Sequence, residues 1–208
     1  MTILNLLKKL PIDLGQANLR KTTKGKLIAL SHVPKGNGKK ALDVGCREGY
    51  QTKWLEKKGY EVTSIDIEKK YEACRIVDVN KRLPFDDRSF DLIWCSEVIE
   101  HLDNPQKTLQ EFRRVLRNDG RIIITTPNSY CTVFRIAYLF GLTPPQMQNK
   151  GHKHFWGINK IRKLFLKAKI RGFFPYSILK MEITSLVGLL SPTFVIIEQK
   201  KTERKKER

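Results

Sequence analysis

Short apolar runs alternate with amphipathic stretches along the first two thirds of the chain. Five runs have the length and β-branched content of strands: 41–46, 61–66, 75–79, 91–96 and 121–126. Residues 51–58 have helical spacing and end at Gly59. A second helix opens at Asn104, carries Leu116 on its apolar face and closes at Gly120. This alternation predicts an α/β protein with a doubly wound, mostly parallel sheet, whose ligand lies at the carboxyl ends of the strands.

The C-terminal part is less regular. A helix is expected over 130–140, a loop over 141–157, a helix over 158–168 that Gly172 breaks, and a last strand over 193–198. We expect seven strands in all. They form a single domain over 39–200, with a helical N-terminal cap at 1–38, a substrate-side cap at 130–180 and a disordered basic tail at 201–208.

Composition and charge narrow the class of protein. A chain of 208 residues with 40% hydrophobic and 29% charged residues excludes collagen-like, disordered and membrane-spanning classes. The net charge of +19 and pI near 9.9 predict an anionic partner. Residues 43–119 carry only −2, whereas residues 120–181 hold eleven basic side chains and no acid. The excess is either a solvated lysine-rich face or a basic rim that faces an anionic acceptor, RNA or a membrane surface.

Cysteine spacing and the N-terminus bear on the compartment. Cys46, Cys74, Cys95 and Cys131 form no CxxC pair, so we expect reduced packing residues rather than a zinc site or disulfides. Charged residues and a proline interrupt residues 1–14, so no secretory signal is expected. The longest apolar runs fall short of the roughly 18–20 residues of a membrane helix. These features favour a cytoplasmic protein without a transmembrane span.

Acidic side chains follow successive predicted strands. Asp43 begins a turn that contains Gly45 and Gly49, and glycine there lets a ligand approach the backbone. Asp66 ends the next strand about twenty residues later, where an acid accepts both hydroxyls of a ribose. Asp78 ends a third strand at the same edge, where it can face an adenine amino group. No phosphate-binding motif follows the turn, so a cofactor with ribose and adenine but no pyrophosphate fits best.

A known family shares this set of features. The residues that carry the resemblance are 42–49, Asp66, Asp78, 83–102, 114–120 and 125–128. Together they resemble a class I S-adenosylmethionine-dependent methyltransferase of the broad ubiquinone-type, type 11 family. The resemblance implies a Rossmann-like methyltransferase fold, S-adenosylmethionine as cofactor and transfer of its methyl group to an oxygen, nitrogen or carbon atom. Arg47 stands where the family's loop usually has its middle glycine.

The resemblance also implies roles for individual residues. The cofactor-binding residues would be Asp43, Val44, Gly45, Cys46 and Gly49 around the methionine part, Asp66 and Ile67 at the ribose, Asp78 and Val79 at the adenine, and Ser96 and Glu97 on the pocket wall. Catalysis would fall to Glu97 and His101, with His101 as general base, although in this family the histidine often only orients the loop. On a helical turn Glu97, Glu100 and His101 would share one face.

Three interpretations of function remain open. The first is methyl transfer to an anionic small-molecule, lipid-linked or glycan-linked acceptor. The second is RNA methylation, because His152 and His154 could join the acids and His101 around a divalent metal, an arrangement similar to that of small-RNA 3′-terminal 2′-O-methyltransferases. The third is a non-catalytic cofactor-binding module, motivated by Arg47. We expect the first and assign no metal ligand; the acceptor atom and oligomeric state stay open.

Overall fold

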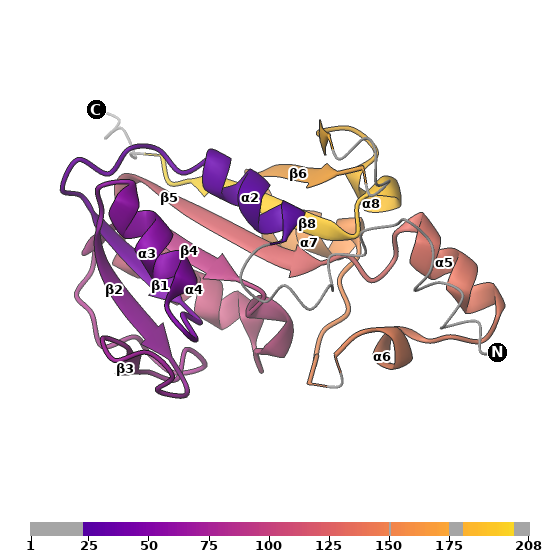
Figure 1. Cartoon of the computed structure of the whole chain (residues 1–208), viewed down its shortest axis with the longest axis horizontal. Helices are drawn as coiled ribbons and strands as arrows, with labels where there is room; N and C mark the ends of the chain where they lie inside the picture. The colour runs from indigo at the N-terminus through magenta and orange to yellow at the C-terminus, as the bar shows by residue number, and fades with distance from the viewer. Residues whose placement is uncertain (1–22, 150, 175–180, 202–208) are drawn as a thin grey trace, which may run out of the picture.

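A computed structural model describes residues 23–149, 151–174 and 181–201, and Figure 1 shows a central twisted sheet with helices on both faces. Residues 1–22 of the predicted N-terminal cap (1–38) and residues 202–208 of the predicted tail (201–208) lie outside the described residues. The sheet has the order β3-β2-β1-β4-β5-β8-β6-β7. Its strands are β1 (Lys40–Val44), β2 (Glu61–Asp66), β3 (Arg75–Ile76), β4 (Phe90–Ser96), β5 (Leu116–Pro127), β6 (Lys169–Phe173), β7 (Glu182–Ile183) and β8 (Thr193–Gln199).

The predicted doubly wound fold is confirmed. Strands β1 to β5 pair in parallel, and β8, β6 and β7 continue the sheet through antiparallel pairs. The strand order reverses between β1 and β4, which is where such sheets bind their ligands. The sheet has eight strands among the described residues rather than the seven expected: the sequence pattern located six of them, and it did not reveal β6 and β7.

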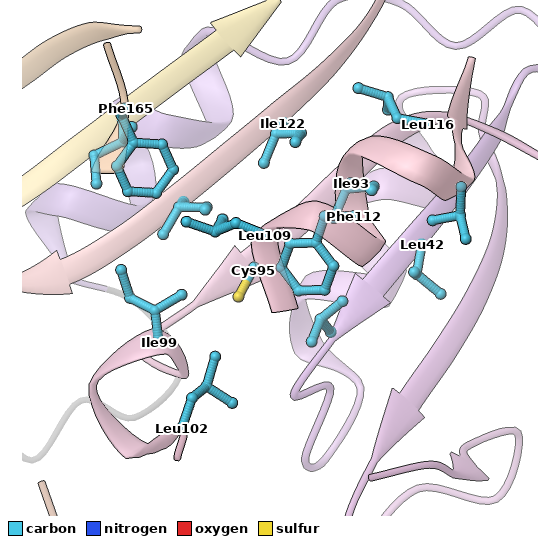
Figure 2. Packing of buried hydrophobic residues seen from close by; sticks show 14 of the residues in the cluster. Leu42, Ile93, Cys95, Ile99, Leu102, Leu109, Phe112, Leu116, Ile122 and Phe165 are labelled. Atoms are coloured by element: carbon cyan, nitrogen blue, oxygen red, sulfur yellow. The ribbon is translucent and has the colours of Figure 1, made fainter. Parts of the chain in front are cut away.

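Helices cover the two faces of the sheet and bury two separate apolar clusters. On one face lie α2 (Lys24–Ser31) and α3 (Tyr50–Lys57), which contribute Ile28 and Leu55 to a cluster with Trp94. The other face is covered by α4 (Pro105–Val115) and α7 (Ile158–Leu164). Figure 2 shows Phe112 of α4 packed over strand residues of this second cluster. Burial on both faces explains why the parallel strands are almost continuously apolar.

Two element boundaries differ from the predictions, for local reasons. Helix α4 ends at Val115, and Leu116 begins β5 instead of continuing the helix, because it pairs with Phe90 through an irregular register. Helix α7 ends at Leu164, and Gly172 lies inside β6 rather than breaking a helix. A Cβ at position 172 would lie 2.4 Å from the Oγ of Ser191, so close packing requires the glycine. The predicted strand 75–79 shortens to β3.

The remaining elements lie beyond the end of β5. They are α5 (Thr132–Leu139), α6 (Pro144–Met147) and α8 (Val187–Leu190), and a short 3-10 turn, η1 (Ile99–His101), follows β4. Figure 1 shows α5 and α6 away from the centre of the sheet. All four cysteines are free and buried. Within the described residues, no helix has both the length and the apolar character needed to cross a bilayer.

Candidate active site

A cavity of about 780 Å³ opens at the carboxyl ends of β1, β2 and β4. This volume falls within the usual range for small-molecule and cofactor sites. Nine of the predicted site residues line it: Val44, Gly45, Asp66, Ile67, Asp78, Val79, Ser96, Glu97 and His101. The other three do not line it: Asp43 lies in β1, and Cys46 and Gly49 lie in the turn that follows. The strand ends therefore bring together most of the side chains that the sequence predicted.

The turn after β1 places bare backbone at the cavity. Gly45 has a φ of +74°, and its N–H donates to the carbonyl of Ile65 at 2.9 Å. A Cβ at this position would lie 2.3 Å from the Cγ2 of Val98, so only glycine fits without displacing that side chain. Gly49, at φ +76°, is the N-cap of α3, and a Cβ there would lie 2.8 Å from the ring of Tyr71. The turn thus presents bare backbone to the cavity at Gly45, while Arg47 and Glu48 of the same turn also line it.

Asp43 shapes this turn from behind. Its carboxylate is 1% exposed and accepts a 2.6 Å hydrogen bond from the hydroxyl of Thr52, which also lies 2.8 Å from the hydroxyl of Ser64. Burial raises the pKa of Asp43 to about 7, and the hydrogen bond from Thr52 opposes that rise. Cys46 is fully buried beside it. These residues hold the loop in position without facing the cavity.

Asp66 is the acid on the cavity wall with the most defined geometry. Its Oδ2 accepts the backbone N–H of Arg47 at 2.9 Å, and its Oδ1 accepts the N–H of Glu68 at 3.2 Å. An ionised carboxylate has about four acceptor positions, so two remain for a ligand. The bond to Arg47 also ties the end of β2 to the turn after β1. Asp66 can therefore accept a pair of hydroxyl groups from a fixed position.

Further hydrogen bonds fix Asp78 and the cavity wall at the end of β4. Asp78 accepts the backbone and side-chain N–H groups of Asn80 at 3.0 and 3.1 Å. At the end of β4, the hydroxyl of Ser96 lies 2.8 Å from that of Thr125, which donates to Glu97 at 2.9 Å. Glu97 has a φ of +56° and precedes η1, so it does not share a helical face with His101 as predicted.

Lys26 is a cavity residue that sequence analysis missed. It lies in the first turn of α2, which Thr23 caps by accepting the N–H of Lys26 at 3.3 Å. Burial lowers the pKa of its ammonium, and the negative charges of Glu97 and Glu100 act in the opposite direction. No motif marks Lys26; the packing of α2 on the sheet, far away in sequence from β4, brings the cation to these acids.

Glu100 and two histidines gather at one end of the cavity. Glu100 is 1% exposed, and its Oε2 accepts the hydroxyl of Thr126 at 2.9 Å. Burial raises the pKa of Glu100 well above its usual range, and the nearby charge of Glu97 adds to the effect. The rings of His101 and His152 lie edge to face, with their centroids 4.8 Å apart. Burial lowers the pKa of His152 to about 4, so its ring is neutral near pH 7.

His154 does not join this group. Its Nε2 donates to the carbonyl of Leu102 at 2.9 Å, and its ring stacks on Trp156. Of the two histidines that the RNA interpretation places at one metal, His152 lines the cavity, whereas His154 does not and bonds to the backbone of Leu102 instead.

Comparisons with known proteins identify the fold and its cofactor. A family profile described as "Methyltransferase domain" matches residues 42–124. The chain carries a class I S-adenosylmethionine-dependent methyltransferase domain. Solved structures similar to it include an S-adenosylmethionine-dependent methyltransferase from Archaeoglobus fulgidus, with a TM-score of 0.63, 19% identity, and coverage of 85% of this chain and 94% of that one. S-adenosylmethionine is accordingly the cofactor of the methyltransferase domain.

A second structural relative of the methyltransferase domain comes from a complex. It belongs to the complex between the Haloferax volcanii Trm112 methyltransferase activator and a putative methyltransferase. The TM-score is 0.62 and the identity 16%, and the match covers 86% of this chain and 89% of that one. At these identities the likeness supports the fold of the domain. It extends well beyond the 42–124 region to most of the described sheet.

Curated relatives of the methyltransferase domain are ubiquinone biosynthesis O-methyltransferases. The protein from Glaesserella parasuis serovar 5 is 28% identical over 136 residues, which cover 57% of this chain and 58% of the relative. The protein from Dechloromonas aromatica is 24% identical over 166 residues, with coverage of 72% and 70%. The chain thus spans little more than half the length of the first of these relatives.

Proposed function

We propose that this protein transfers a methyl group from S-adenosylmethionine to an anionic small-molecule or lipid- or glycan-linked acceptor. The observation that carries the proposal is Asp66, which stands at the end of β2 on the cavity wall with two acceptor positions left for a ribose. The curated relatives are named O-methyltransferases, which supports an oxygen as the acceptor atom. When bound, the cofactor supplies a methyl group on a positively charged sulfur.

The residues of the cavity fit the parts of this cofactor. Asp66 and Ile67 would bind the ribose, and Asp78 and Val79 the adenine. The bare backbone of Gly45 leaves room for the methionine part, and Lys26 offers a cation for its carboxylate. Glu97 lies on the same wall and would bind its amino group, which matches a zwitterion with two opposite charges.

Acceptor binding and activation would fall to the opposite end of the cavity. His101 lies there, and its Nδ1 donates to the carbonyl of Gly151 at 2.9 Å, which leaves Nε2 as the acceptor nitrogen of the neutral ring. His101 would accept the proton that an acceptor hydroxyl loses when its oxygen takes the methyl group. The walls would hold the acceptor in line with the transferred carbon, which lowers the barrier by fixing orientation.

The basic charge supports an anionic acceptor. Residues 120–149 and 151–174 contain basic side chains and no acid, and the loop that carries Gln148 and His152 on the cavity wall belongs to this region. A negatively charged acceptor would be drawn to this side by long-range attraction. The 43–119 region, in contrast, carries a net charge of only −2 and holds the strand ends that would bind the cofactor.

Binding of S-adenosylhomocysteine to the purified full chain, measured by calorimetry, tests the cofactor half of the proposal. We expect saturable binding, with an affinity at least about 100-fold lower in Asp66→Ala, because two charge-assisted hydrogen bonds are lost. Asp86→Ala is the matched control, since Asp86 is exposed and away from the cavity. Absence of binding by the folded wild-type chain, or equal binding by Asp66→Ala, would contradict the proposal.

The acceptor half needs a turnover assay. Formation of S-adenosylhomocysteine is followed with phenolic, carboxylated and lipid-linked acceptors and, separately, with RNA oligonucleotides. Turnover with a small or lipid-linked acceptor supports the proposal, whereas turnover with RNA alone establishes the RNA interpretation instead. Cofactor binding without turnover on any of them would favour a non-catalytic module.

A further inference from the structure

Unpaired polar atoms gather on side chains of this cavity. Among the described residues, six buried side-chain nitrogen or oxygen atoms lack a hydrogen-bond partner. Three of them belong to residues that line the cavity: Oε1 of Glu100, Nε2 of Gln148 and Nδ1 of His152. Nearly all buried polar atoms of folded proteins are paired, so each exception needs a physical reason. A ligand that pairs with these atoms when it fills the cavity supplies that reason.

Gln148 supplies the hydrogen-bond donor of this set. The residue is only 7% exposed, and its Oε1 accepts the hydroxyl of Ser129 at 2.9 Å. Ser129 is itself buried, and its N–H donates to the carbonyl of Trp156 at 2.9 Å, so the anchor of the amide is fixed. Because the hydroxyl donates to the amide oxygen, the two N–H groups of Nε2 remain for another partner. The amide therefore offers N–H donors from a fixed position on the cavity wall.

The loop that carries Gln148 also orients the proposed proton acceptor. Nδ1 of His101 donates to the carbonyl of Gly151 at 2.9 Å, three residues after Gln148. The same loop is anchored to η1, because the carbonyl of Glu100 accepts the N–H groups of residues 153 and 154 at 2.8 and 3.0 Å. One anchored loop thus fixes both the free Nε2 of His101 and the amide of Gln148. An acceptor whose hydroxyl meets His101 would present a second polar group to Gln148.

The surroundings of Gln148 suit an oxygen atom carried on an apolar body. Burial lowers the pKa of His152 to about 4, so its ring is neutral near pH 7. Burial also raises the pKa of Glu100 well above its usual range, which lessens the repulsion of a ligand oxygen by this carboxyl group. Leu102 and Met147 add apolar surface to the same cavity. An oxygen that accepts an N–H group therefore fits this place.

We propose that Gln148 determines acceptor specificity by donating a hydrogen bond to a carbonyl-type oxygen of the methyl acceptor. The acceptor would then be a hydroxylated molecule that also carries a carboxylate, ester or amide group on an apolar body. A molecule without that oxygen leaves the buried N–H groups unpaired when it fills the cavity, and sites built in this way discriminate strongly. The assignment rests on the proposed function, because it names the class of acceptor for the same cavity.

Calorimetry with small probes tests the role of Gln148. The three hydroxybenzoate isomers, their methyl esters and phenol are titrated into the full chain saturated with S-adenosylhomocysteine. We expect at least one isomer and its ester to bind at least about fivefold more tightly than phenol. Gln148→Glu replaces the donor by an oxygen and should abolish this preference for the ester as well as for the acid. Gln146→Glu is the matched control, because it adds the same charge outside the cavity lining and keeps the oxygen that accepts from Thr143.

Melting temperature and S-adenosylhomocysteine affinity of both variants show whether they fold, and Gln148→Met replaces Gln148→Glu if the latter does not. The proposal is overturned if no probe binds up to about 10 mM, if phenol binds as tightly as every isomer and ester, or if the Gln148 variant keeps the preference. With S-adenosylhomocysteine still bound, these results leave the proposed function standing. The probes are also titrated without S-adenosylhomocysteine: a preference that depends on Gln148 in a chain that fails to bind S-adenosylhomocysteine would uphold the oxygen-binding role and refute the proposed function.

Discussion

Asp43 should make the stability of this fold depend on pH. Burial raises its pKa from an ordinary 3.8 to about 7, although Thr52 donates a hydrogen bond to it and Lys26 lies near enough to act against the rise. The folded state therefore holds the proton more tightly than the unfolded chain. Its contribution to stability is fully present below pH 3.8 and is lost as the pH rises through about 7.

The size of the effect follows from the same two values. A tenfold difference in proton affinity is worth about 1.4 kcal/mol, so the full contribution is about 4 kcal/mol. At pH 5 about 2–3 kcal/mol of it is present, because the unfolded carboxyl is already mostly ionised there, and at pH 8 almost none is left. Asp43→Asn removes the titrating group and keeps an acceptor for the hydroxyl of Thr52.

Urea denaturation at pH 5 and pH 8 measures this contribution. The free energy of unfolding should fall between these pH values by about 2–3 kcal/mol more in the wild type than in Asp43→Asn. Asp86→Asn removes an exposed carboxylate and should follow the wild type. Equal pH dependence in wild type and Asp43→Asn would refute the argument that burial dominates at this residue.

Two further substitutions test the packing around the site and the sheet. In urea denaturation, Gly45→Ala should lower the free energy of unfolding by about 1–3 kcal/mol more than Gly38→Ala. Both glycines have a positive φ, but only at Gly45 would a Cβ collide with Val98. Equal losses in the two variants would contradict this. Arg113→Met should cost about 3–5 kcal/mol in the same assay, since Arg113 donates two hydrogen bonds of 2.6 and 2.8 Å to the buried carboxylate of Glu198. The double variant with Glu198→Leu should recover at least half of the loss, and no recovery would show that another contact dominates.

The sequence predicts the parts of the cavity that come from strand ends. The family resemblance, and not the strand pattern, named Glu97. Asp66 and Asp78 each follow an apolar run, and parallel strands place their carboxyl ends at one edge. The register between strands is set by the same buried pattern that marks the strands themselves. Local pattern and global position therefore agree for these acids, which is why sequence analysis located them.

The opposite wall was less predictable because tertiary packing builds it. Lys26 reaches the acids through the docking of α2, and His152 meets Glu100 only because backbone bonds anchor the 141–157 loop to η1. Hydrophobic periodicity carries no information about such contacts. The two histidines of this loop are equivalent in sequence, and only the structure shows that His152 enters the cavity while His154 does not.

Arg47 shows how the structure absorbs a departure from the family pattern. It adopts a φ of +47°, a conformation that costs a residue with a side chain about 1–2 kcal/mol, and its N–H donates to Asp66 at 2.9 Å. The backbone of the turn is therefore the one that glycine would adopt, and its link to the end of β2 is intact. Arg47 is exposed and lines the cavity. The arginine therefore adds a cation beside the cavity. Because the turn after β1 keeps its path, we expect the chain to bind S-adenosylmethionine despite this residue.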